Sequence, residues 1–262
     1  MIVLGFDTAT PATAIGLRLT DGSAAQARDD PQPGERPGHA TRLLPLATKL
    51  LAEAGLRFRD LDRIAVGLGP GTFTGLRIGV ATARGLAQSL GVELVGVSSL
   101  RALAEPPLRA AATEIDASGS PDGVLAVIDA RRGQAFTAAY ALADGSDMNR
   151  EQVMSFELSA PRAFAPADLG EVLDGASARA GEPLAHWLAV GDGAVLYRNR
   201  LEALGVRIPQ DSSPLHRVSG EAICEIAVSS AAQALDAVLP DYRRRPDAEI
   251  ALEGAASERA RA

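Results

Sequence analysis

A glycine-rich stretch, Gly67 to Gly79, constrains the fold of this chain more than any other feature. It reads Gly-Leu-Gly-Pro-Gly-Thr-Phe-Thr-Gly-Leu-Arg-Ile-Gly, follows the apolar run Ile64–Val66 and opens a long helical pattern. This order predicts a buried strand, a tight turn and a helix. Glycine permits backbone conformations and close approaches that other residues exclude. The turn therefore suits either an anion at the helix N-terminus or direct packing of backbone on backbone.

The spacing of the glycines excludes two common phosphate-binding loops. A P-loop needs a lysine after its last glycine, and the only lysine of the chain, Lys49, lies elsewhere. A dinucleotide-binding Gly-x-Gly-x-x-Gly pattern that starts at Gly67 fails, because position 72 is threonine. The glycine-rich stretch therefore predicts neither of these loops.

A strand that ends in aspartate and a turn occurs twice. The apolar run Met1–Phe6 leads into Asp7, and the run Val124–Ile128 leads into Asp129. Alternating patterns then predict two further strands in each half. These lie at residues 13–19 and 24–29 in the first half and at 135–142 and 152–158 in the second. The repetition predicts a duplicated fold of two α/β lobes with the aspartates at equivalent hairpin turns.

Helical patterns and prolines outline the rest of the chain. Helices are expected at residues 39–54, 76–90, 99–104 and 217–238, and Pro45 either kinks the first or lies near its start. Buried strands are expected at 63–68, 92–97 and 188–190. Pro106–Pro107 marks a candidate boundary before a linker-like stretch. We therefore expect a first lobe at 1–105, a second at 106–240 whose final helix can pack back on the first, and a partly disordered tail at 241–262.

The amino-acid composition limits the range of functions that this chain can have. Apolar residues make up 47% of the 262 residues, which is ample for a core, and the net charge is −7. An acidic chain does not bind nucleic acid through bulk charge alone. The single cysteine, Cys224, excludes an internal disulfide and has an apolar setting, so we expect a buried structural thiol. We expect no signal peptide, no membrane span and a cytoplasmic location.

Several segments resemble one protein family. The motif Gly-Pro-Gly-Thr-Phe-Thr-Gly-Leu-Arg-Ile-Gly, at residues 69–79, is similar to the signature of the bacterial TsaB (YeaZ) family. Met1–Ala9, Gly96–Leu100 and Asp129–Gly133 fit the same family pattern, and residues 190–193 and 241–244 fit it more loosely. The resemblance implies two ribonuclease-H-like lobes of the actin, hexokinase and Hsp70 fold.

The resemblance also implies a function. TsaB proteins are non-catalytic subunits that pair with the transferase TsaD and, with the ATPase TsaE, support threonylcarbamoyl transfer to the adenosine beside the tRNA anticodon. It implies a homodimer when TsaD is absent, tRNA contact only through the complex, no intrinsic cofactor, and ATP or ADP only at the level of the complex. A second hypothesis is an enzyme of the same fold: a threonylcarbamoyltransferase, a small-molecule kinase or a glycoprotease-type hydrolase.

The first two helices are the predicted partner interface, because that face pairs in the TsaB family. The first offers more leucines than one narrow core stripe needs, and the second carries small residues at every fourth position, which permit close approach. Packing of this stripe on the lobe's own sheet is the alternative. The interface candidates are His39, Leu43, Leu44, Ala47, Leu50, Leu51, Gly75, Leu76, Gly79, Ala83 and Ala87.

A second set of residues is a candidate for phosphate or nucleotide contact. Hairpin aspartates hold a magnesium-bound phosphate in the kinases of this fold, but an aspartate that caps its own turn is the interpretation we favour here. TsaD carries a His-x-x-x-His metal pair, whereas His39 is followed four residues later by leucine, so no metal is expected. The phosphate-contact candidates are Asp7, Thr8, Gly71, Thr72, Arg77, Asp129 and Arg131.

Overall fold

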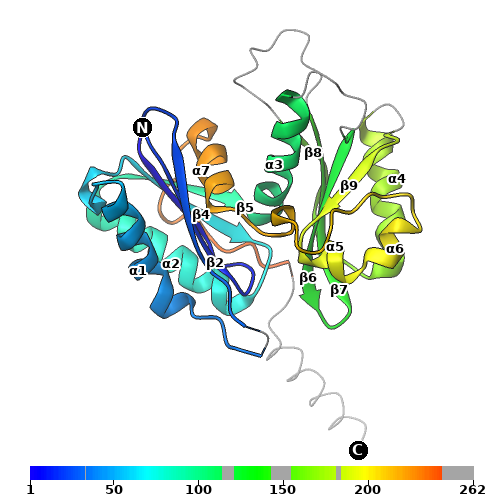
Figure 1. The fold of residues 1–262 in the computed structure, drawn as a ribbon, viewed down its shortest axis with the longest axis horizontal. Coiled ribbons are helices and arrows are strands. Elements are labelled where there is room, and N and C mark those ends of the chain that lie inside the picture. Colours follow the sequence, from blue (N-terminus) through cyan, green and yellow to red (C-terminus); the bar gives the residue numbers. More distant parts are fainter. Residues whose placement is uncertain (33, 114–120, 143–154, 181–183, 244–262) are drawn as a thin grey trace, which may run out of the picture.

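Two β-sheets organise the chain into two lobes (Figure 1). The computed structural model describes residues 1–32, 34–113, 121–142, 155–180 and 184–243. The sheets have the strand orders β3-β2-β1-β4-β5 and β8-β7-β6-β9. In both, an antiparallel meander of three strands is extended by a parallel strand beside the first. This is the predicted pair of ribonuclease-H-like lobes of the actin, hexokinase and Hsp70 fold.

Strands β1, β2 and β4 of the first sheet are buried on both faces, whereas the edge strand β3 is not. The strands of this sheet are β1 (Val3–Asp7), β2 (Thr13–Arg18), β3 (Ala24–Asp29), β4 (Arg63–Gly69) and β5 (Glu93–Ser98). Successive side chains of a strand point to opposite faces. Leu4 and Phe6 accordingly join the core beneath α1 (His39–Glu53) and α2 (Phe73–Leu90), whereas Val3 faces the second lobe. Figure 1 shows α1 and α2 side by side on the outer side of this sheet.

The second sheet packs its outer face on a separate group of helices. Its strands are β6 (Gly123–Arg131), β7 (Gln134–Leu142), β8 (Ser155–Phe164) and β9 (Trp187–Val190). Leu125 and Val127 of β6 meet the apolar side chains of α4 (Leu169–Ala180), α5 (Asp192–Leu196) and α6 (Arg198–Glu202). Three short 3₁₀ helices complete the described structure: η1 (Phe58–Asp60), η2 (Pro166–Asp168) and η3 (Pro214–His216).

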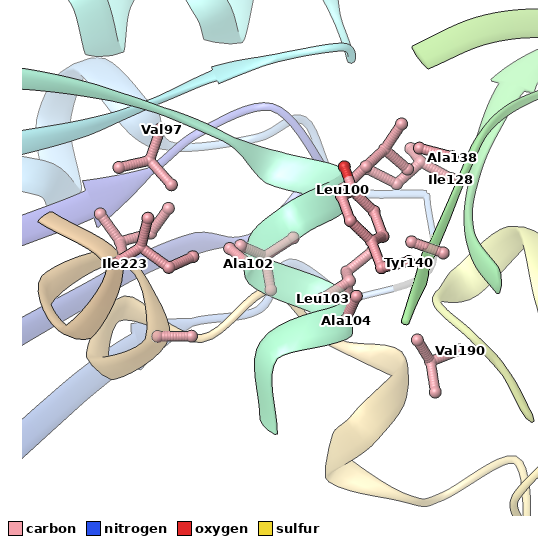
Figure 2. Packing of buried hydrophobic residues seen from close by; sticks show 14 of the residues in the cluster. Val97, Leu100, Ala102, Leu103, Ala104, Ile128, Ala138, Tyr140, Val190 and Ile223 are labelled. Carbon is pink, nitrogen blue, oxygen red and sulfur yellow. The ribbon is translucent and has the colours of Figure 1, made fainter. Parts of the chain in front are cut away.

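Two helices fill the space between the lobes, α3 (Ser99–Thr113) and α7 (Gly220–Ser229). Figure 2 shows Leu100 and Leu103 of α3 close to Tyr140 and Ala138 of the second sheet, with Ile223 of α7 on the other side of the helix. All of these side chains belong to one buried apolar cluster that includes residues of both sheets. The two lobes therefore share a continuous core.

Cys224 is the buried structural thiol that its apolar setting predicts. Its side chain is 0% exposed, and its Sγ lies 3.5 Å from the carbonyl oxygen of Val3. Burial raises the pKa of the thiol to about 12, so it stays protonated and unreactive. Helix α7 packs closely on β2 because Gly16 has no side chain. A Cβ at that position would lie only 2.2 Å from the carbonyl carbon of Gly220.

The expected boundary at Pro106–Pro107 is wrong as a break in structure, because α3 continues through both prolines to Thr113. The side chains on either side of the proline pair, Ala104 and Leu108, are both 0% exposed. Their packing holds the helix together although proline removes a backbone donor. The first part of the expected linker is therefore helical. Likewise α1 begins at His39 and continues through Pro45.

The final helix is shorter than expected, since α7 ends at Ser229 and not at Val238. The guanidinium of Arg63 donates to the carbonyl oxygens of Ala227 and Ser230, which satisfies the end of the helix. Residues 231–243 then return along the first sheet, where the N–H of Asp241 donates to Leu68 at 2.8 Å. The last part of the expected second lobe thus belongs to the first. Most of the expected tail, residues 244–262, lies outside the described residues.

Candidate functional site

Asp7 ends β1 in a carboxylate whose two oxygens both accept hydrogen bonds within the chain. The N–H of Ala9 donates to Oδ1 at 2.8 Å, and the hydroxyl of Ser99 donates to Oδ2. The side chain is 1% exposed. Burial raises the pKa of the Asp7 carboxyl, and the bonds from Ser99 and Ala9 oppose that shift. Asp7 therefore caps its own turn through the bond from Ala9, while its contact with phosphate stays a prediction.

Asp129 has the equivalent place in the second lobe. Its Oδ1 accepts from the N–H of Arg131 at 2.8 Å, and its Oδ2 pairs with the Arg131 guanidinium at 3.2 Å. The side chain is 16% exposed, so this carboxylate is more accessible than that of Asp7. Arg131 and Arg132 have positive φ angles of 64° and 53° in the turn. In both hairpin turns the aspartate accepts from the N–H two residues later, but Asp129 is more exposed than Asp7.

Asp192 is bound to the second hairpin turn by a hydrogen bond from its backbone. Its Oδ1 accepts from the backbone N–H of Asp129 at 3.0 Å. Desolvation of the Asp192 carboxyl raises its pKa, the hydrogen bond from the Asp129 N–H opposes this, and the nearby charge of Asp129 adds to it. This arrangement requires glycine at position 191. Its φ is 109°, and a Cβ there would clash with the carbonyl oxygen of Val127, at 2.0 Å.

The glycine-rich turn packs against the Asp7 turn backbone on backbone. The N–H of Thr72 donates to the carbonyl oxygen of Ala9 at 2.7 Å, and a Cβ at Gly71 would lie 2.3 Å from the same oxygen. The Thr8 hydroxyl donates to the carbonyl oxygen of Gly75 at 2.7 Å. Of the two possibilities that the sequence left open, close packing is therefore the one that these contacts satisfy.

Arg77 binds two aromatic side chains, those of Phe73 and Tyr242. Its guanidinium carbon lies 3.7 Å from the ring centroid of Phe73, and its Nε donates to the Tyr242 hydroxyl at 2.9 Å. The rings of Phe73 and Tyr242 are 5.0 Å apart. Stacked in this way, Arg77 fastens residues 231–243 to α2. Its contact with phosphate stays a prediction without support from this geometry.

The prediction that apolar residues of α1 and α2 stay exposed after the lobe has packed is wrong for most of the predicted interface residues. Leu43, Leu51 and Ala83 are 2%, 1% and 0% exposed and lie in the core of the first lobe. A sheet covered by two helices buries a wide arc of each, which absorbs the extra leucines. Of the predicted set only Leu44, at 45% exposure, reaches the surface. The buried members are His39, Leu43, Ala47, Leu50, Leu51, Gly75, Leu76, Gly79, Ala83 and Ala87.

The small-residue stripe on α2 has an internal explanation. A Cβ at Gly75 would lie 2.0 Å from the carbonyl oxygen of Thr8, and one at Gly79 would lie 2.3 Å from its hydroxyl oxygen. Gly85 differs, because it is exposed and a Cβ there would meet nothing within 4 Å. Together with the exposed Ala81, it gives α2 a second small face directed outward.

The histidines have separate surroundings. Nδ1 of His39 lies 2.8 Å from the Thr13 hydroxyl, and burial lowers the pKa of its imidazole. His186 lies 3.2 Å from Asp122, and His216 lies between the carbonyl oxygens of Gly191 and Pro209. Among the described residues, no three His, Cys, Asp or Glu side chains gather as a metal site would require. None of the described helices has the length and apolar character needed to span a bilayer.

Sequence reasoning missed three residues of the site. The sequence places Ser99 only at the start of an expected helix, yet its hydroxyl accepts from the N–H of Gly69 at 3.2 Å as well as donating to Asp7, and so joins the two turns. Asp192 and Tyr242 lie in segments that matched the family pattern loosely, which was the only signal for them. Their partners are distant in sequence, so no local pattern could assign their roles.

Three comparisons with known proteins bear on this arrangement. The model of the family described as "TsaD: tRNA N6-adenosine threonylcarbamoyltransferase" matches residues 35–252. The Escherichia coli "tRNA threonylcarbamoyladenosine biosynthesis protein TsaB" is 36% identical over 140 residues, which are 53% of this chain and 55% of that protein. The Bacillus subtilis protein of the same name is 34% identical over 145 residues, 55% and 57% of the two chains.

A solved structure extends the likeness beyond these segments. YeaZ from Pseudomonas aeruginosa superposes with a TM-score of 0.65 at 26% identity, over 92% of this chain and 99% of that one. By sequence, the chain spans about half the length of the curated relatives that it matches. The family model nevertheless covers most of the chain, and together with these relatives it shows that the chain belongs to the TsaB (YeaZ) family.

Proposed function

We propose that this chain is a non-catalytic subunit in tRNA threonylcarbamoyladenosine biosynthesis and that it acts by pairing with a TsaD protein. The observation that carries the proposal is the state of Asp7. Both of its carboxylate oxygens accept hydrogen bonds within the protein, and its side chain is 1% exposed. A carboxylate that is buried to this extent and bonded within the protein is not exposed to a metal-bound phosphate. The names of the E. coli and B. subtilis relatives supply the pathway.

The alternative is an enzyme of the same fold, and the family model named for the transferase favours it. Asp129 is the group best placed for such a role, because it is more exposed than Asp7. Its oxygens nevertheless cap the turn and pair with Arg131. We therefore prefer the non-catalytic role. In that role, TsaE, a nucleotide and tRNA bind to the assembled complex and not to this chain alone.

The outward face of α1 and α2 is the proposed pairing surface. It carries Leu44 on α1 and the small residues Ala81 and Gly85 on α2. Glycine inside a helix costs about 1 kcal/mol relative to alanine, and Gly85 has no contact within its own lobe that requires it. Close packing of a partner helix on this face explains why glycine stands at position 85. The same face serves a second copy of the chain when TsaD is absent.

Replacing Ala81 with glutamate should weaken pairing with the TsaD of the same organism by about 30-fold or more, the effect of losing one hot-spot contact. The added side chain would force a charge between two helices that must approach closely. Sedimentation of the purified proteins measures the complex. Ala178→Glu is the matched control, because Ala178 is an exposed alanine on α4 in the second lobe. Equal complex formation by both variants would rule out this face.

A further inference from the structure

A cavity of about 240 Å³ lies where the two lobes meet, away from both hairpin turns. It is bounded by the end of β5, the first turn of α3, strands β7 and β8, and helix α7. Drug-sized ligands occupy about 300–1,000 Å³, so a nucleotide is too large for it and a small metabolite is not. The polar and apolar side chains that matter here are Ser98, Arg101, Tyr140, Glu157 and Ile226.

Tyr140 brings to this cavity a buried hydroxyl that makes no hydrogen bond with the described residues. The side chain is 2% exposed, and its hydroxyl has no hydrogen-bond partner among the described residues. Ser98 is close enough to lower the pKa of the phenol, but the two hydroxyls do not meet hydrogen-bond geometry. Burial outweighs this effect and raises the pKa, so the phenol keeps its proton and can donate it. Figure 2 shows Tyr140 beside Leu100 in the first turn of α3.

Arg101 gives the same end of the cavity a positive charge. Its Nε is buried and makes no hydrogen bond among the described residues, and it lies 3.9 Å from Glu105. The residue belongs to the first turn of α3, where the helix dipole also favours an anion. Arg101, whose Nε pairs with Glu105 at 3.9 Å, and Tyr140, whose hydroxyl lacks a hydrogen bond among the described residues, thus line one small space beside a helix N-terminus. A carboxylate group suits that combination.

Glu157 supplies the complementary charge. Its carboxyl lines the cavity from β8. Glu157 is exposed as a whole, but partial burial of its carboxyl raises its pKa, the charges of Arg243, Arg179 and Arg101 oppose that shift, and the charge of Asp241 adds to it. One carboxylate, one guanidinium and one phenol therefore line a space that is large enough for one small molecule.

We propose that this cavity binds a small zwitterion, a free α-amino acid, whose carboxylate meets Arg101 and Tyr140 and whose ammonium group meets Glu157. The site draws on both lobes, because Arg101 lies on α3 between them and Tyr140 lies in the second sheet. A ligand there stabilises the arrangement of the lobes, since whatever binds only the folded state raises its stability. The inference stands independently of the proposed pairing with TsaD.

Isothermal titration of the full chain with each standard amino acid in turn, and with acetate, tests the site. At least one amino acid should bind with a dissociation constant below about 1 mM. Tyr140→Phe and Arg101→Gln should each weaken that binding by about tenfold or more, whereas Tyr197→Phe and Arg84→Gln, matched changes outside the cavity, should leave it unchanged. Glu157→Gln should weaken amino-acid binding but not the weaker binding of acetate.

Melting of the ligand-free variants separates binding from folding. Because the Tyr140 hydroxyl is unpartnered, Tyr140→Phe should keep or raise the melting temperature while it loses the ligand. The proposal is overturned if no amino acid binds at about 10 mM, a concentration at which even a weak site is largely filled. It is equally overturned if acetate binds as tightly as the best amino acid, or if the cavity variants and the control variants bind alike.

Discussion

Replacing Gly75 with alanine should destabilise the protein by about 3 kcal/mol, the upper range for overpacking a well-packed site. The added Cβ would lie 2.0 Å from the carbonyl oxygen of Thr8, which is backbone and cannot rotate away. Any shift of α2 would also stretch the 2.7 Å bond from the Thr8 hydroxyl to the Gly75 carbonyl. Urea unfolding followed by circular dichroism measures the loss.

Gly85→Ala is the matched control on the same helix. A Cβ at Gly85 meets nothing within 4 Å, so alanine there should stabilise the protein by about 0.5–1 kcal/mol through its higher helix propensity. Opposite signs for the two substitutions would establish that the glycines of α2 serve different purposes. The same small gain at both positions would contradict the close packing of α2 on the Asp7 turn.

Replacing Ala83 with glutamate should remove most of the stability of the first lobe, a loss of about 4 kcal/mol or more for an unpaired charge in the core. Ala83 is 0% exposed and lies among apolar residues of α1, α2 and the first sheet. Neither a partner charge nor space for the larger side chain is provided there. Thermal and urea unfolding of the purified variant measure the effect.

Ala81→Glu, two residues away on the outward face, separates folding from pairing. It should change the free energy of unfolding by no more than about 0.5 kcal/mol, as exposed substitutions usually do. A stable Ala83→Glu variant that fails only to bind TsaD would reverse the assignment. The buried face of α2 would then open to a partner.

The duplicated architecture could be predicted because it is written in local patterns. An apolar strand, an aspartate and a turn occur at the head of each half, and the structure pairs both as antiparallel hairpins, with Asp7 opposite Ala14 and Asp129 opposite Ala135. The capping role of the aspartates was predictable for the same reason, since the N–H groups that they accept from lie two residues further on.

The inward and outward faces of α1 and α2 could not be assigned from the sequence. Periodicity shows which residues share a face, as Gly75, Gly79 and Ala83 do, but not whether that face meets the lobe's own sheet or a partner. Both packings favour small residues. The deciding contact is with Thr8, about seventy residues earlier, and only the fold brings it to α2.

Long-range packing also explains the errors in helix length. Pro106 and Pro107 normally end a helix, yet the buried residues around them keep α3 intact. The helical pattern after Ser229 is interrupted because Arg63, on a distant strand, binds the last carbonyl groups of α7. The cavity beside Tyr140 was beyond sequence reasoning for the same reason, as its residues come from five separate elements.

The rate of threonylcarbamoyladenosine formation with an Asp129→Asn variant tests the central claim most directly. The reaction is reconstituted with the TsaD and TsaE of the same organism, and the variant replaces this chain at equal concentration. Asparagine can still accept from the N–H of Arg131, so the turn should persist. A non-catalytic subunit predicts a rate within about twofold of the wild type, whereas a loss of about 10²–10⁴-fold, typical for a catalytic acid or base, would contradict it.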